Sequence, residues 1–69
     1  MNETYRGYMI RVTRTVRWDA VLVEVATDTM LPTKATALMR EGRSVAVDRA
    51  RALIDIYVKA GDAQRERAA

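Results

Sequence analysis

The chain has 69 residues, with 12 basic and 9 acidic side chains, and it contains neither cysteine nor histidine. These absences exclude disulfides and thiolate or imidazole metal sites, and they remove the usual general base and the most reactive nucleophile. The carboxylates show no convergent pair, because Asp19 and Glu24 have opposite parity on one strand and point to opposite faces. We therefore predict no catalytic, metal-binding or cofactor-binding residue and no enzymatic activity.

Length and composition indicate one small domain. Residues 1–4 are expected to be loose, residues 5–60 to form the folded core and residues 62–69 to form a flexible tail. The polar N-terminus has no signal-peptide core, and no apolar run approaches the roughly 20 residues that span a bilayer. A chain without cysteine also gains nothing from an oxidising compartment. We expect a soluble, cytoplasmic protein that does not contact a membrane.

Residues 5–16 show the period-two pattern of a half-buried strand. Tyr8, Ile10 and Val12 share one face of this strand, and Met9 and Arg11 share the other. Residues 14–17 lack the Asn-Gly or Asp-Gly pair of a tight hairpin. The connection to the next element is therefore either a looser turn or a continuation of the strand before the chain reverses.

Residues 18–27 form the strongest predicted strand, because both of its faces are apolar. One face carries Val21, Val23 and Val25, and the other carries Trp18, Ala20 and Leu22. A strand covered on one side only would alternate cleanly with polar residues, so this strand should be central in the sheet, or its second face should be covered by something other than the helix. The sequence leaves open which face a helix covers, and both sets of three residues are candidates for an interaction face.

Residues 33–43 admit two interpretations. Residues 34–40 could form a third strand, or residues 37–41 could form a helical turn before the break at Gly42. The strand is favoured because three strands cover a helix better than two. Pro32, just upstream, marks a position without a backbone donor for a strand ladder.

Residues 45–60 are predicted to form one amphipathic helix. Ser44 can cap its first turn, and Gly61 can take the left-handed conformation that ends a helix. Apolar residues recur three and four apart along one stripe, which comprises Val47, Ala50, Leu53, Ile54, Tyr57 and Val58. Leu53 and Ile54 are expected to be among the most buried residues. The other side carries charges spaced to form ion pairs with one another on a solvated face, namely Asp48, Arg51, Asp55 and Lys59.

Together these elements predict an α+β fold in the order βββα, in which a three-stranded antiparallel sheet is packed on one face by one C-terminal amphipathic helix. The segment Glu41–Ser44, with the later Ala46, Ala50, Leu53, Ile54 and Tyr57, resembles the strand-to-helix junction of HicB-type antitoxins. Leu31-Pro32 is similar to the Leu-Pro that such proteins carry before their third strand. In this sequence no strand follows the helix and no DNA-binding module is attached, so the resemblance implies no operator-binding role.

The order of features along the chain carries a second resemblance. Tyr5-Arg6-Gly7-Tyr8 opens the first strand, Trp18 leads the second, and a helix with alanines, Leu53-Ile54-Asp55 and Tyr57 closes the chain. This pattern resembles small uncharacterised βββα proteins of proteobacteria. The resemblance implies a bacterial protein of this fold and no particular activity.

Two functions are compatible with these features. The first is a non-catalytic interaction module, because a helix on one sheet face leaves the other apolar face of the second strand for a partner, most simply a second copy in a homodimer or else another protein. The second is weak, sequence-independent nucleic-acid binding, because the excess positive charge lies in residues 1–18. The candidate polyanion contacts are Arg6, Arg11, Arg14 and Arg17, with Tyr5 available to stack on a base.

Overall fold

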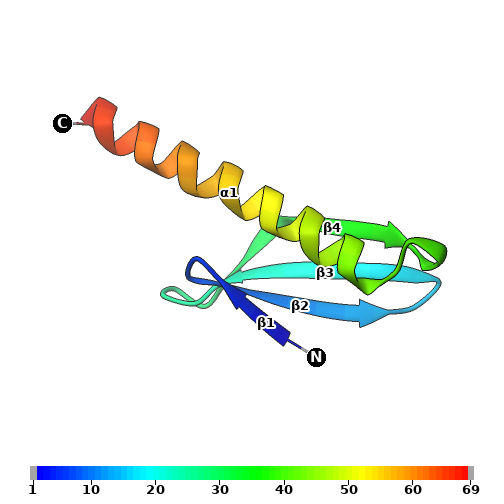
Figure 1. Cartoon of the computed structure of the whole chain (residues 1–69). Coiled ribbons are helices and arrows are strands. Elements are labelled where there is room, and N and C mark those ends of the chain that lie inside the picture. The colour runs from blue at the N-terminus through cyan, green and yellow to red at the C-terminus, as the bar shows by residue number, and fades with distance from the viewer. Residues whose placement is uncertain (1, 69) are drawn as a thin grey trace.

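The structure, a computed structural model, describes the backbone of residues 2–68 and the side chains of residues 2–61. Four antiparallel strands form one sheet in the order β1-β2-β3-β4, and one long helix crosses a single face of that sheet (Figure 1). The elements are β1 (Asn2–Tyr5), β2 (Tyr8–Arg14), β3 (Arg17–Glu24), β4 (Thr29–Leu38), the 3-10 helix η1 (Met39–Glu41) and α1 (Arg43–Ala68). The α+β class, the antiparallel sheet and the single C-terminal helix are confirmed, and the number of strands is corrected from three to four.

The additional strand comes from a hairpin near the start of the chain. The predicted strand at residues 5–16 is divided at Arg6-Gly7, where both residues have positive φ, 49° and 84°. Tyr5 pairs with Tyr8 across these two residues, as in the tight turns that join antiparallel strands. The sequence pattern missed the turn because a residue with a side chain rarely adopts positive φ. Residues 2–4, expected to be loose, pair with β2 and are corrected to strand.

β4 begins earlier than predicted and contains the proline. It runs from Thr29 to Leu38 rather than over residues 34–40, and the helical turn η1 follows it. The predicted strand and the alternative helical turn before Gly42 are therefore both present in part. The register shifts between the pairs Val21↔Lys34 and Val23↔Met30, which leaves residues 31–33 as an irregularity in the ladder. Pro32 lies in this irregularity on an edge strand, where its missing amide removes no ladder hydrogen bond.

α1 extends beyond both predicted ends. It begins at Arg43, so Ser44 lies within the first turn, and the break before the helix is at Gly42, which has a φ of 90°. Gly61, expected to end the helix, lies inside it, as a glycine can at a cost of about 1 kcal/mol. The expected flexible tail at 62–69 falls on residues whose side chains are outside the described part of the structure.

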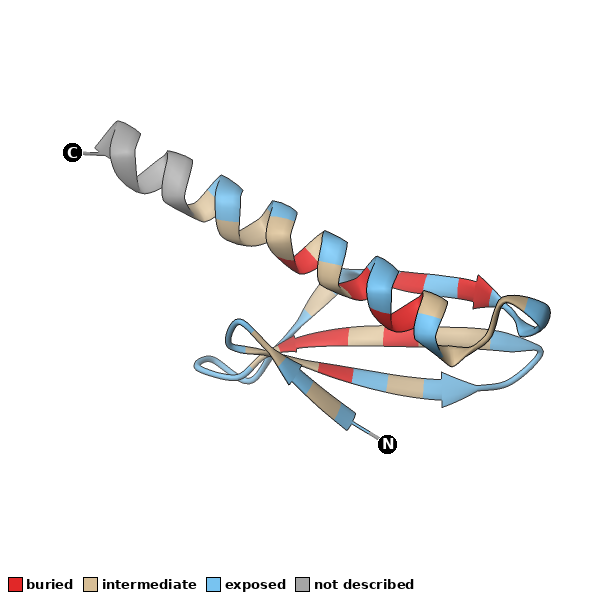
Figure 2. Ribbon diagram, viewed as in Figure 1, coloured by how far each residue is buried: buried red, intermediate tan, exposed pale blue. Residues whose placement is uncertain are grey.

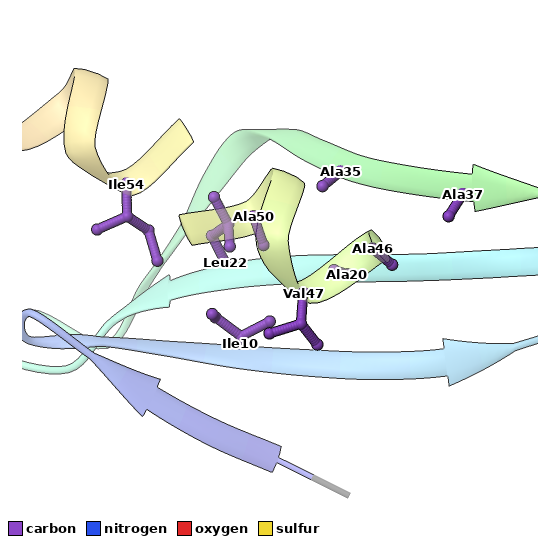
Figure 3. Close-up of a cluster of buried hydrophobic side chains, with 9 residues drawn as sticks. All are labelled: Ile10, Ala20, Leu22, Ala35, Ala37, Ala46, Val47, Ala50 and Ile54. Carbon is purple, nitrogen blue, oxygen red and sulfur yellow. The ribbon is translucent and has the colours of Figure 1, made fainter. Parts of the chain in front are cut away.

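The core lies between α1 and the sheet, where the buried residues gather (Figure 2). Nine buried residues form this cluster, and five of them are alanine. The sheet contributes Ile10, Ala20, Leu22, Ala35 and Ala37, and the helix contributes Ala46, Val47, Ala50 and Ile54 (Figure 3). Ile54 is fully buried as predicted, whereas Leu53 only packs against the edge of the cluster.

This difference in burial gives a stability prediction. Replacing Ile54 by alanine removes a fully buried side chain, and we expect the free energy of unfolding to fall by about 2–5 kcal/mol. Leu53→Ala should have a smaller effect, and Ile56→Ala, at a side chain that is 64% exposed, should have almost none. Urea unfolding followed by circular dichroism measures all three. Equal losses for the three variants would contradict the placement of the core.

Candidate interaction surface

α1 covers only one of the two candidate faces of β3. Trp18, Ala20 and Leu22 lie beneath the helix, where Ala20 and Leu22 are completely buried and Trp18 packs against the cluster. Ala20 and Leu22 are therefore corrected from candidate interaction residues to core residues, and Trp18 to a partly buried residue that packs against the core. Val21 and Val23 have the opposite parity on β3 and lie on the other face. No element of the described chain covers that face, which we call the open face (Figure 1).

The strand register arranges the open face in rows across the sheet. One row contains Thr4, Met9, Val23 and Met30, and the next contains Asn2, Arg11, Val21 and Lys34. Val23 is only 6% exposed, although no helix lies over it, because its cross-strand neighbours Met9 and Met30 flank it. Met30 is 60% exposed, and Val25, one residue beyond β3, is 53% exposed. The end of the open face near the β3–β4 turn is therefore apolar.

The rest of the open face is basic. Arg11, Arg17 and Lys34 share the parity of Val21 and Val23, and the acid among them is Asp19. Asp19 accepts a hydrogen bond from Arg17 Nε at 3.2 Å, and its Oδ1 atom lies 3.8 Å from Lys34 Nζ. This face therefore has one carboxylate and three cations, two of which contact the carboxylate, so it carries excess positive charge beside its apolar end.

The structure disperses the five predicted polyanion contacts. Arg11 and Arg17 lie on the open face, whereas Arg14 has the opposite parity on β2 and stacks over Trp18 with its guanidinium carbon 5.8 Å from the ring centroid. Tyr5 and Arg6 are at the β1–β2 hairpin, at the other end of β2 from Arg14. The structure therefore brings together two of the five residues and places the other three elsewhere.

Tyr5 and Arg6 both contact the same carboxylate on α1. The Tyr5 hydroxyl donates to Asp55 Oδ1 at 2.9 Å, and Arg6 Nη1 donates to the same atom at 2.8 Å. These hydrogen bonds, the one from Arg6 first, lower the pKa of Asp55, and the bond to Asp55 raises the pKa of Tyr5. Arg51 lies over the Tyr5 ring, 5.8 Å from its centroid. With these contacts, one face of the Tyr5 ring is occupied by Arg51 and its hydroxyl is bonded to Asp55.

The charged side of α1 contacts β1 rather than forming only pairs within the helix. Arg51 bonds to Glu3 of β1, and its distance to Asp48 is 3.6 Å. Among the helix charges that were expected to pair with one another, Asp48 and Arg51 form an ion pair within the described residues. Sequence spacing could not reveal the contacts of Arg51 and Asp55 with the first hairpin, because that hairpin was not predicted.

On its other flank, α1 contacts the outer edge of β4. Arg49 donates to the Thr36 carbonyl at 2.9 Å and to both carboxylate oxygens of Glu41, at 2.7 and 3.1 Å. Glu41 also accepts a hydrogen bond from the Leu38 amide at 2.9 Å. The hydrogen bonds from Arg49, followed by the one from Leu38, lower the pKa of Glu41. We call Arg49 and Glu41 the edge clasp, which no local sequence pattern indicates.

No known protein family, curated protein or solved structure matches this chain. The resemblances to HicB-type antitoxins and to small βββα proteins therefore stay predictions. The described residues form no pocket and no group of acidic residues that could hold a metal ion. Among them, α1 is not apolar enough over the necessary length to cross a bilayer.

The contacts of Asp55 predict how stability depends on pH. The pKa of Asp55 is lower in the folded chain than in the unfolded chain. The ionised carboxylate of Asp55 therefore stabilises the fold above the ordinary aspartate pKa, and this stabilisation is lost as pH falls through the lowered value. Asp55→Asn should therefore reduce stability at pH 7 and make stability less dependent on pH in the range below about pH 4. Urea unfolding at pH 7 and pH 3 tests this expectation. Asp48→Asn, at a side chain that is 73% exposed, is the control and should change little.

Proposed function

We propose that this chain is a non-catalytic interaction module that binds a second copy of itself through the open face of its sheet. The observation that supports this proposal is the position of Met9, Val21, Val23 and Met30 on a face that α1 does not cover. Antiparallel sheets that face water on one side normally carry polar residues there, whereas β3 carries two valines. A second sheet packed on this face would remove Met9, Val21 and the 60% exposed Met30 from water, and it would contact Val23, which is already buried.

The composition of the core favours a second copy as the occupant. Five of the nine clustered core residues are alanine, so α1 buries little apolar area per residue when it packs on the sheet. A chain of 69 residues is also near the lower size limit for independent stability. A second copy is present wherever the chain is folded, and it would supply an identical apolar face.

The size of the face indicates a reversible dimer. The four strands contain 4, 7, 8 and 10 residues, so at about 4.8 Å between strands and about 3.4 Å per residue their face spans roughly 19 by 25 Å. This is small compared with standard interfaces, which bury about 800 Å² on each partner. The facing sheets would also bring Arg11 and Lys34 of one copy near those of the other, and like charges oppose association. We therefore expect association at micromolar concentrations and expect added salt to strengthen it.

We place this module in the cytoplasm of a bacterium, as the absence of cysteine and the resemblance to proteobacterial βββα proteins suggest.

Sedimentation equilibrium tests the proposal directly. The wild-type chain should be dimeric at micromolar concentration, and Val21→Glu should shift it to a monomer by placing a carboxylate at the centre of the open face. Val21 pairs with Arg11 on β2 and with Lys34 on β4, so the new carboxylate has cationic neighbours and the fold should persist. Val16→Glu makes the same change at a turn residue that is 88% exposed and is the matched control.

Three results would contradict self-association through the open face. They are a wild-type monomer at all accessible concentrations, a Val21→Glu dimer as strong as the wild type, or equal loss of the dimer in Val16→Glu. Circular dichroism of each variant distinguishes loss of the interface from loss of the fold.

The second candidate function is nucleic-acid binding, and the observation that favours it is the group of Arg11, Arg17 and Lys34 on one uncovered face. Three phosphate contacts would release counterions, so log affinity should fall with log salt with a slope of about −2 to −3. Salt would thus weaken nucleic-acid binding but strengthen the dimer.

Fluorescence anisotropy with labelled single- and double-stranded oligonucleotides measures the slope. Arg11→Glu should weaken binding, and Arg40→Glu, outside the open face, should not; no binding at low salt would exclude this function.

A further inference from the structure

β4 lies at the edge of the sheet and is its longest strand. An uncovered strand edge presents unpaired backbone amides and carbonyls to any other strand, and natural proteins obstruct such edges. The groups that occupy the outer side of β4 therefore decide whether the sheet can grow by adding a strand.

On the regular part of β4 after the irregularity, the backbone groups on the outer side belong to Lys34, Thr36 and Leu38. The Thr36 carbonyl accepts from Arg49 and the Leu38 amide donates to Glu41, so neither group bonds to β3. In an antiparallel strand the amide and the carbonyl of one residue point to the same side, as do those of residues two apart. Lys34 has the same parity, which places its amide and carbonyl on the outer side as well.

The edge clasp occupies the place where another strand would bond. Arg49 donates to the Thr36 carbonyl, and Glu41 accepts from the Leu38 amide. The two side chains also bond to each other through two hydrogen bonds, which hold both in position. Both side chains are partly exposed, at 49% for Arg49 and 29% for Glu41, so they lie over the edge rather than within the core.

We propose that the edge clasp prevents β4 from pairing with β4 of a second copy, and that without it two chains join edge to edge into one eight-stranded sheet. This contact is made by the backbone edge of β4 and not by packing one open face on another, so the proposal goes beyond the face-to-face dimer and does not depend on it.

A second copy is the occupant that suits this edge, because the outer residues of β4 are complementary to themselves. An antiparallel pair centred on Thr36 places Thr36 opposite Thr36 and Lys34 opposite Leu38. Lysine then faces leucine rather than another lysine, which avoids like charges directly across the pair. The three outer residues of each strand would exchange about six backbone hydrogen bonds.

The experiment removes the clasp in a chain that cannot use its open face. Every variant carries Val21→Glu, and the test variant adds Arg49→Ala and Glu41→Ala. We expect its mass in sedimentation equilibrium to be twice that of the Val21→Glu chain. Hydrogen exchange followed by NMR should show slower exchange of the Lys34 and Thr36 amides, which would lie at the new junction.

Two further variants identify the edge as the contact. Adding Thr36→Pro to the test variant removes the central amide of the predicted pairing, and because this amide points away from β3 the sheet should remain intact. That variant should be a monomer. The matched control replaces Asp48 and Lys59 by alanine instead of the clasp, which removes the same charges from exposed helix positions. It should also be a monomer.

Each alternative result would overturn the proposal. A folded test variant that stays monomeric would show that the clasp does not restrain the edge. A dimer that persists with Thr36→Pro, or with unchanged exchange of the Lys34 and Thr36 amides, would place the contact elsewhere. A dimer of the Asp48 and Lys59 control would assign the effect to charge alone. None of these results bears on the wild-type dimer through the open face, which is measured without these changes.

Discussion

Close contact between α1 and the sheet depends on small side chains. Alanine fills five of the nine positions of the buried cluster, while Ile10, Leu22 and Ile54 are its largest fully buried members. A methyl group lets the two backbones approach, but it also removes little apolar area from water, and the stabilisation from burial scales with that area. The core by itself therefore holds the helix and the sheet together with a small margin, and contacts outside the core carry more weight than in a larger domain.

Those outer contacts lie along the two flanks of α1. On one flank Arg51 and Asp55 reach β1, and on the other Arg49 reaches β4 while the Tyr57 hydroxyl lies 2.6 Å from Thr33 Oγ1. Exposed ion pairs of this kind contribute about 0–1 kcal/mol each, so their main effect is to fix the position of the helix between the two edge strands. The helix is thereby held over one face, and the other face of the sheet is left without cover from residues 2–61.

Local patterns in the sequence predicted the parts of the fold that depend on neighbouring residues. Parity along β3 correctly separated Val21 and Val23 from Trp18, Ala20 and Leu22, and the apolar stripe correctly identified Ile54 as core. The sequence could not decide which face α1 covers, because that depends on how the chain passes from β4 to the helix. The hairpin at Arg6-Gly7 was missed because it requires an arginine with positive φ. The edge clasp was missed because Glu41 and Arg49 are eight residues apart and meet only in the folded chain.

The contact between the first hairpin and α1 joins residues far apart in the chain, since Tyr5 and Asp55 are separated by 50 positions. The turn at Arg6 adopts an unfavourable backbone conformation, and its side chain bonds to the same Asp55. β1 is an edge strand that pairs only with β2 in the described sheet, so its contacts with α1 add to the single ladder that holds it. We therefore expect β1 to take its final position only after the long loop between Tyr5 and Asp55 has closed, and loop closure of this kind slows folding more than it weakens the folded state. Residues 2–5 are in this way expected to be among the last of the described residues to acquire their structure.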